Sequence, residues 1–292
     1  MTDLKDLTVQ SLFDIKGWVA VVTGGGTGLG LITAKALAAN GAKVYITGRR
    51  VEKLKDAETT DSASGGSIIG VQMDVTDKDS IRAAAKQISE KEKHVNLLVN
   101  NAGVSGVNYG SSGMPKGSAE EISKAMFDSQ TIEDWDWIFK VNATSSYFVS
   151  AAFLPLLCAA RDTAGYPEAG SILNISSISG ITKESQNGQF CYNASKAAAI
   201  SLTEQLAVDF KRPGLEVRVN TLAPGYFPSE MTPIDAEAGK EKAHFRADPW
   251  SIPFGRAGRP RDYAQAVLNF AVNQYVTGST LVIDGAWLLA HA

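Results

Sequence analysis

The chain has 292 residues, and its 28 Lys and Arg against 31 Asp and Glu give a formal net charge of −3. Apolar residues make up 44% of the chain and charged residues 20%, which is ordinary for a globular protein that buries its own core. The slight acidic excess argues against a general nucleic-acid binder, which needs a basic surface. Two cysteines and three scattered histidines form neither a disulfide framework nor a metal-binding pattern, so we expect no metal site.

The N-terminal segment predicts neither export nor membrane insertion. It carries Asp3, Lys5, Asp6 and Asp14, and it lacks the apolar stretch of a signal peptide. The sequence has no run of about 20 apolar residues, so we expect no membrane span. We therefore expect a cytoplasmic protein with an N-terminal extension over residues 1–12 and with no membrane or nucleic-acid partner.

Strands and helices are expected to alternate along the chain. Helical spacing predicts a long, interrupted helix over 132–157, with Pro155 near its end. The alternation indicates one α/β domain, 1–292, with helices on both faces of a parallel sheet. Apolar and β-branched runs predict strands at 18–23, 43–47, 67–73, 96–100, 171–175, 216–222 and 280–284. The other main helices are expected at 29–40, 51–57, 80–92, 192–210 and 261–273.

Three segments lack this periodicity. Residues 59–66 are a loop by composition. Residues 104–131 begin with many Gly, Ser and Asn residues and predict a long surface loop with a short helix at 120–125. Residues 224–260 are rich in proline and show little regular spacing.

The first strand and the first helix are joined by a glycine-rich turn, Thr23-Gly24-Gly25-Gly26-Thr27-Gly28-Leu29-Gly30. Glycines permit a tight turn and let backbone N–H groups approach a pyrophosphate, whose charge the helix N-terminus favours. In this strand–turn–helix context the turn predicts a dinucleotide site, and a purely structural turn is the alternative.

The residues after the second strand bear on which dinucleotide binds. An NAD enzyme usually carries Asp or Glu here to accept hydrogen bonds from the ribose hydroxyls. This chain has Gly48, Arg49 and Arg50 instead. No carboxylate repels a 2′-phosphate and two guanidiniums can pair with one, so NADP(H) is favoured over NAD(H). Arg49 is the better candidate, because Arg50 can also be read as a solvated charge at the start of a helix.

The ends of the third and fourth strands carry further candidates. Asp74, followed by Val75, could accept a bond from an adenine amino group, or it could be a turn former. Small residues follow the fourth strand in Asn100-Asn101-Ala102-Gly103. They suit a cofactor that crosses the sheet edge.

A proton-transfer group is predicted where the helix at 192–210 begins. Tyr192 and Lys196 are four residues apart and share a helical face, so the ammonium would stabilise a phenolate. Carbonyl reduction needs such an acid–base group. A hydroxyl of Ser176 or Ser177, just after the fifth strand, could hold the substrate oxygen. Asn142 is unfavourable in the middle of a helix unless its amide is satisfied, which indicates either a role at the site or a satisfied core amide.

Jointly, these motifs resemble the short-chain dehydrogenase/reductase family, in its NADP(H)-preferring branch, over residues 13–289. Pro224-Gly225, Thr277-Gly278 and Asp284-Gly285 add to the match. The resemblance implies a single Rossmann-type domain with a seven-stranded sheet. It also implies a homotetramer or dimer, because an apolar C-terminal end such as 287–290 usually lies in a subunit interface in this family.

The resemblance implies a catalytic tetrad. Tyr192 would be the acid–base group, Lys196 would lower its pKa and bind ribose, Ser177 would orient the carbonyl, and Asn142 would hold a water in a proton relay. The usual basic position in the glycine turn is Thr27 here, so phosphate recognition would rest on Arg49 alone. The implied cofactor contacts are Thr23, Gly24, Gly26, Thr27, Gly28, Leu29, Gly30, Arg49, Asp74, Val75, Asn101, Ala102, Gly103, Tyr192, Lys196, Pro224, Gly225, Phe227 and Ser229.

The chain departs from the family pattern at two places. The spacing from the catalytic serine to the tyrosine is commonly thirteen in the family, and it is fifteen here if Ser177 is the match, which leaves Ser179 as a rival. The segment 104–131 is longer than usual and would form a substrate wall or an oligomer contact. The segment 225–260 would form a substrate lid.

Residues 223–232 and 251–260 look like those of β-ketoacyl reductases of the rhamnolipid-pathway type. We therefore expect NADPH-dependent reduction of a ketone in fatty-acyl or secondary metabolism. An NADP(H)-binding sensor or scaffold, an imine reduction and a rearrangement are the alternatives. The substrate would be a small ketone or an acyl thioester. A carrier-bound substrate would need a basic patch such as Arg256, Arg259 and Arg261, and a small one an apolar lid such as Tyr226, Phe227, Phe245, Trp250 and Phe254.

Overall fold

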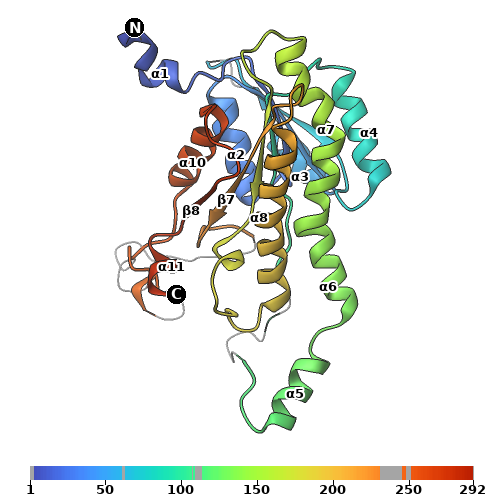
Figure 1. Ribbon diagram of the computed structural model, residues 1–292, viewed down its shortest axis with the longest axis vertical. Coiled ribbons are helices and arrows are strands. Elements are labelled where there is room, and N and C mark those ends of the chain that lie inside the picture. Colours follow the sequence, from blue (N-terminus) through green and yellow to red (C-terminus); the bar gives the residue numbers. More distant parts are fainter. Residues whose placement is uncertain are drawn as a thin grey trace.

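A parallel β-sheet forms the centre of this computed structural model, and helices cover both of its faces (Figure 1). The structure describes residues 3–60, 63–106, 108, 114–230, 245–247 and 251–291. The strand order is β3-β4-β2-β1-β5-β6-β7-β8, so the chain order reverses between β1 and β5. The strands are β1 (Val19–Thr23), β2 (Lys43–Gly48), β3 (Thr59–Thr60), β4 (Ser67–Gln72), β5 (Leu97–Asn100), β6 (Ser171–Ile175), β7 (Arg218–Pro224) and β8 (Thr280–Ile283).

The predicted α/β class is confirmed, and the predicted number of seven strands is corrected to eight in the described part of the chain. The additional strand is β3, which pairs antiparallel with β4 through Thr59 and Ile68. It lies in the segment whose composition predicts a loop. Both residues of β3 are exposed, so this short edge strand carries no apolar pattern that sequence analysis could detect.

The central strand β1 shows how the core is built. All five of its residues are buried, and it pairs with β2 on one side and β5 on the other. Ala20 and Val22 join the core cluster on one face of the sheet, whereas Val19 and Val21 join the cluster on the other face. A parallel strand that is covered on both faces is apolar throughout instead of alternating, as residues 19–23 are.

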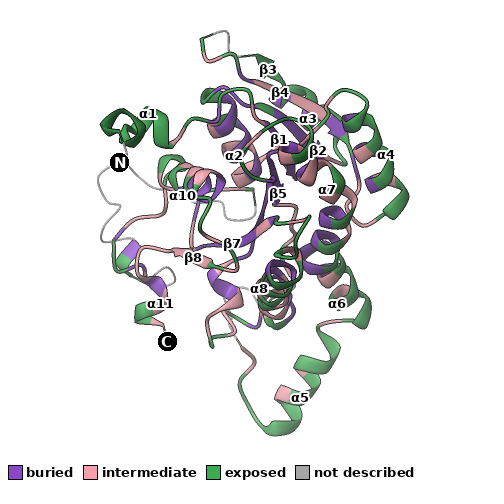
Figure 2. Ribbon diagram, turned by 45° about the horizontal axis from the view of Figure 1, so that its top comes forward, coloured by how far each residue is buried: buried purple, intermediate pink, exposed green. Residues whose placement is uncertain are grey.

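Two groups of helices make these core clusters. Helices α2 (Gly28–Ala39), α3 (Val51–Ala57) and α10 (Pro260–Val272) pack on one face of the sheet. Helices α4 (Lys78–Ser89), α7 (Ser145–Asp162) and α8 (Phe190–Phe210) contribute to the cluster on the other face. Their buried sides face the sheet and their exposed sides face outward (Figure 2).

The predicted interrupted helix over 132–157 consists of α6 (Ile132–Phe139), a π-helical turn (Lys140–Thr144) and α7. It continues beyond Pro155, which lies inside α7. By length and composition the stretch Ile132–Asp162 could cross a membrane, because its most apolar window has a mean hydropathy of 1.5. Half of that window is buried inside the protein, where α7 packs against the sheet. Burial in the core accounts for its apolar composition.

Three of the remaining elements of the described chain lie at the periphery. The predicted N-terminal extension holds a 3₁₀ turn (Leu4–Leu7) and α1 (Val9–Leu12), neither with a buried residue. Helix α5 (Ala119–Asp128), longer than the predicted 120–125, projects from the body of the protein (Figure 1). A 3₁₀ turn (Ile178–Gly180) and α11 (Trp287–Ala290) complete the chain. Residues 107 and 109–113 of the predicted loop, and 231–244 and 248–250 of the predicted lid, including Trp250, lie outside the described residues.

Candidate active site

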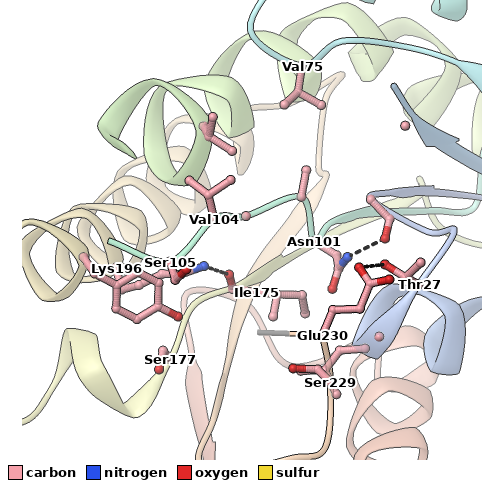
Figure 3. A pocket seen from close by; sticks show the side chains of 18 of the residues that line it. Thr27, Val75, Asn101, Val104, Ser105, Ile175, Ser177, Lys196, Ser229 and Glu230 are labelled. Atoms are coloured by element: carbon pink, nitrogen blue, oxygen red, sulfur yellow. Dashed lines mark hydrogen bonds between the residues drawn. The ribbon is translucent and has the colours of Figure 1, made fainter. Parts of the chain in front are cut away.

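A cleft of about 570 Å³ runs along the carboxyl ends of the parallel strands (Figure 3). It lies where the strand order reverses between β1 and β5, the position at which open α/β sheets bind nucleotides. Most of the predicted site residues line it. They are Gly24, Gly26, Thr27, Gly28, Leu29, Arg49, Asp74, Val75, Asn101, Ala102, Gly103, Ser177, Tyr192, Lys196, Pro224, Gly225, Phe227 and Ser229.

The glycine turn has the shape that a diphosphate requires. Gly24 and Gly28 have φ values of +63° and +53°, which side chains disfavour. A Cβ at Gly30 would overlap the carbonyl oxygen of Gly24, so only glycine lets α2 approach the turn this closely. Thr27 is the N-cap of α2, yet its side chain makes no capping hydrogen bond. The first N–H groups of α2 therefore keep their affinity for an anion.

Thr23 does not line the cleft but braces its floor. Its Oγ1 accepts hydrogen bonds from the backbone N–H groups of Asn101 and Ala102, both at 3.0 Å. The Asn101 amide donates in return to the carbonyl oxygens of Thr23 at 2.9 Å and Gly24 at 3.2 Å. These bonds tie the end of β1 to the end of β5, so the glycine turn and the Asn101-Ala102-Gly103 segment form one rigid surface.

Basic side chains gather at the end of the cleft next to β2. Arg49 lines the cleft, and its guanidinium lies 5.5 Å from the ring centroid of Trp137 on α6. Arg50 also lines the cleft, where it donates to Glu230 Oε2 at 2.9 Å and to Thr27 Oγ1 at 3.3 Å. The reading of Arg50 as a mere solvated charge is therefore incomplete, because its side chain reaches the glycine turn.

Asp74 lies beside these cations and is held ionised. Burial raises the pKa of its carboxyl, but hydrogen bonds from Thr76 and the charges of Arg49 and Lys140 outweigh burial and lower the pKa overall. Thr76 donates to Asp74 Oδ1 from its backbone N–H at 2.9 Å and from its hydroxyl at 2.7 Å. Asp74 is thus both a turn former and a cleft residue, since its second oxygen remains an acceptor.

The other end of the cleft holds the predicted proton-transfer group (Figure 3). The Lys196 ammonium lies 5.7 Å from the ring centroid of Tyr192 and donates to the carbonyl oxygen of Ile175 at 3.1 Å. The Ser177 hydroxyl lies within hydrogen-bonding reach of the Tyr192 phenol. Strand β6 and helix α8 thus bring Ser177, Tyr192 and Lys196 together, because the residues after β6 fold back onto the first turns of α8.

The pKa values differ from the simplest expectation. Burial raises the pKa of Tyr192, and its hydrogen bond with Ser177 offsets only part of this effect. Burial also lowers the pKa of Lys196 to about 8. The expected lowering of the phenol pKa by Lys196 is therefore not a property of the chain by itself. Removal from water disfavours the charged form of both side chains.

The structure separates the two candidate serines. Ser177 Oγ accepts from the backbone N–H of Ser179 at 3.1 Å and lies next to Tyr192. The Ser179 hydroxyl points elsewhere and donates to Gln186 Oε1 at 2.6 Å. The geometry therefore favours Ser177 as the hydroxyl beside the reacting oxygen.

Asn142 lies behind the cleft wall, in the π-helical turn between α6 and α7. Its Nδ2 donates to the carbonyl oxygen of Val104 and to Ser195 Oγ, both at 3.0 Å, and its Oδ1 accepts from the Val104 N–H at 2.8 Å. Both N–H groups of the amide and one of the two lone pairs of its oxygen are engaged, and the amide anchors the segment that enters the substrate end of the cleft. The contacts of Asn142 are therefore those of a satisfied core amide, the second of the two alternatives. The residue nevertheless lies next to the site.

Sequence reasoning missed several cleft residues, among them Trp137, Glu230 and Gln186. All line the cleft, but they come from α6, from the start of the predicted lid and from the loop before α8. Only the unusual spacing between Ser177 and Tyr192 gave a signal, for Gln186. Trp137 and Glu230 reach the site through tertiary packing that no local pattern encodes.

The family is decided by comparison with known proteins. The model of the short chain dehydrogenase family matches residues 18–239, well over half of the chain. This chain is a short-chain dehydrogenase/reductase. It is accordingly an oxidoreductase that uses a nicotinamide dinucleotide on small-molecule substrates.

Relatives of this short-chain dehydrogenase/reductase span almost its whole length. It is 37% identical to the short-chain dehydrogenase/reductase VdtF of Byssochlamys spectabilis, over 98% of this chain and 97% of that protein. It is 32% identical to the rhamnolipids biosynthesis 3-oxoacyl-acyl-carrier-protein reductase of Pseudomonas aeruginosa, over 95% of this chain and 98% of that protein. The solved RhlG/NADP active-site complex of Pseudomonas aeruginosa has a TM-score of 0.75 at 30% identity, covering 94% of this chain and 98% of that one.

Proposed function

We propose that this short-chain dehydrogenase/reductase uses NADPH to reduce a ketone to a secondary alcohol. The proposal rests on one arrangement above all: Ser177, Tyr192 and Lys196 meet at one end of a cleft whose other end is basic. The glycine turn between these ends suits a diphosphate, so the shape and charge of the cleft match an extended dinucleotide. When bound, the cofactor supplies a hydride to the carbonyl carbon.

The side chains at the catalytic end then handle the proton. Ser177 holds the carbonyl oxygen, and Tyr192 donates its phenolic proton to that oxygen as charge develops on it. Because burial raises the pKa of Tyr192, the phenol is protonated at neutral pH, as a proton donor must be. Lys196 stabilises the phenolate that remains and binds the cofactor ribose, and Asn142 holds a relay water.

The preference for NADPH follows from the basic end. Arg49 binds the 2′-phosphate, and a cation–π contact with the Trp137 ring holds its guanidinium in place. Gly48 leaves no carboxylate at the end of β2 to repel that phosphate. The solved NADP complex of the Pseudomonas aeruginosa relative supports the same choice. A cytoplasmic location and a homotetrameric or dimeric assembly remain predictions.

Isotope transfer tests the reaction class. The purified protein is incubated with a ketone and with NADPH carrying deuterium at the transferable position, and the alcohol is analysed by mass spectrometry. We expect one deuterium on the carbinol carbon of the product. An alcohol without deuterium on the carbinol carbon would contradict ketone reduction by hydride transfer.

A further inference from the structure

The spacing between Ser177 and Tyr192 is two residues longer than is common in the family, and the loop between them brings Gln186 into the cleft. The proposed chemistry does not use Gln186. The chain turns there through three successive left-handed residues, Gln186, Asn187 and Gly188, with φ values of 49°, 66° and 82°. Two of these are not glycine, and such backbone strain persists only where the surroundings hold it in place. The loop is therefore a built feature next to the reacting phenol.

Several hydrogen bonds hold Gln186 in this strained position. Its Oε1 accepts from the Ser179 hydroxyl at 2.6 Å, and its carbonyl oxygen accepts from Gln189 Nε2 at 2.9 Å. Its side chain also hydrogen-bonds the Tyr226 phenol. Because Oε1 takes the Ser179 proton, the amide nitrogen is the donor toward Tyr226. An amide nitrogen carries two N–H donors, so the second is available to a ligand in the cleft that Gln186 lines.

The charged side chains that line the cleft indicate the charge of the ligand group that Gln186 would bind. Among the described residues that line the cleft, the cations are Arg49, Arg50, Lys53 and Lys196. The first three lie at the end next to β2, and Lys196 belongs to the proton-transfer group. The substrate end instead presents the neutral polar side chains of Ser105, Ser179, Gln186 and Gln189.

We propose that Gln186 binds a second, neutral oxygen of the substrate, so that this enzyme prefers ketones that carry an ester, ether, hydroxyl or further carbonyl close to the reacting carbonyl. This inference rests on the proposed ketone reduction and specifies its substrate class. Ser179 fixes the orientation of the amide, and the strained loop fixes its position. A plain alkyl ketone would offer this amide N–H no acceptor, and a site built to hydrogen-bond a substrate group discriminates against analogues that lack that group.

Two pairs of nearly isosteric ketones test this preference. Ethyl acetoacetate is paired with methyl pentyl ketone, in which two CH₂ groups replace the C(=O)–O of the ester, and chromanone is paired with tetralone, in which one CH₂ group replaces the ring oxygen. For each pair the ratio of kcat/KM values is measured with NADPH for the wild type and for Gln186→Glu, which keeps the shape but removes the N–H donors. Gln186→Asn, which suits a left-handed backbone but shortens the side chain, is the second variant. Asn187→Asp is the matched control, because Asn187 is the exposed, left-handed neighbour that does not line the cleft.

We expect both Gln186 variants to lower the oxygenated-to-hydrocarbon ratio about tenfold, and Asn187→Asp to leave it unchanged. A merely structural role for Gln186 would slow both members of a pair equally. Equal ratios in the wild type and both Gln186 variants would overturn the inference while ketone reduction stands. Absence of turnover with all four ketones, at the level of Tyr192→Phe, would overturn the proposed function and this inference with it.

Discussion

The ammonium nitrogen of Lys196 donates to the carbonyl oxygen of Ile175, the last residue of β6, at 3.1 Å. This contact fixes the side chain of a lysine that is only 4% exposed, and burial lowers its pKa to about 8. The protein thus keeps a partly desolvated cation next to Tyr192. Its stability and its chemistry both depend on this placement.

The lowered pKa of Lys196 predicts how stability depends on pH. In the unfolded chain Lys196 stays protonated up to about pH 10.4, whereas in the folded chain it loses its proton near pH 8. Between these values the unfolded state binds more protons at Lys196, so the contribution of Lys196 to the free energy of unfolding rises with pH in this window. Relative to Lys196→Met, the wild type should gain about 2–3 kcal/mol between pH 7 and pH 10. Urea unfolding at several pH values measures this; a difference that stays constant with pH would contradict it.

Asn142 should matter for both stability and activity. Asn142→Leu keeps the volume but leaves the N–H and carbonyl oxygen of Val104 without their partner. We expect a loss of about 2–4 kcal/mol in the free energy of unfolding and at least a tenfold fall in kcat. Thr144→Ala, an exposed position on the same π-helical turn, serves as the control. Wild-type stability in Asn142→Leu would show that these bonds contribute nothing.

The brace made by Thr23 can be tested against its neighbour in register. Thr23→Val removes the acceptor of two backbone N–H groups, so the free energy of unfolding should fall by about 2–3 kcal/mol. Thr47 pairs with Thr23 across β1 and β2, and its buried hydroxyl has no hydrogen-bond partner in the described part of the chain. Thr47→Val should therefore be neutral or stabilising. Equal losses in both variants would refute the brace.

Cofactor choice should depend on Arg49. Arg49→Ala should raise the KM for NADPH at least tenfold and change the KM for NADH by less than about threefold, because only NADPH carries the 2′-phosphate. Trp137→Leu should give a smaller rise of about threefold for NADPH, as expected for a lost cation–π contact. Lys55→Ala on the last turn of α3, outside the cleft, is the control. Parallel changes for both cofactors would mean that Arg49 does not read the phosphate.

Local patterns predict most of the strands and helices of this fold. Buried parallel strands are apolar runs, and Gly and polar residues mark their ends, so residues 171–175 are assigned correctly to the residue. Apart from the long helix at 132–162, the predicted ends lie within three residues of those observed. Strand β3 is not predicted, because an exposed pair of threonines shows no hydrophobic periodicity.

In the candidate site, too, local sequence patterns predict some residues, whereas others depend on tertiary packing. The glycine turn and the Tyr192–Lys196 pair are contiguous in sequence, so their joint geometry follows from a turn and one helical repeat. Glu230 meets Arg50 across 180 residues of chain, and this contact depends on the packing of separate segments. The pKa of Tyr192 also depends on its burial, which a helical spacing does not report.

The central claim is that Tyr192 donates a proton during NADPH-dependent ketone reduction. The most direct measurement is NADPH oxidation, followed by absorbance, with β-ketoesters and bulky cyclic ketones for the wild type and Tyr192→Phe, with NADPH binding measured by fluorescence in parallel. We predict turnover by the wild type, a loss of about 10²-fold or more in Tyr192→Phe, and NADPH binding that weakens by no more than about tenfold, because the variant loses only one hydroxyl contact. Undiminished turnover in Tyr192→Phe, or a wild type that binds NADPH but reduces no ketone, would contradict the account.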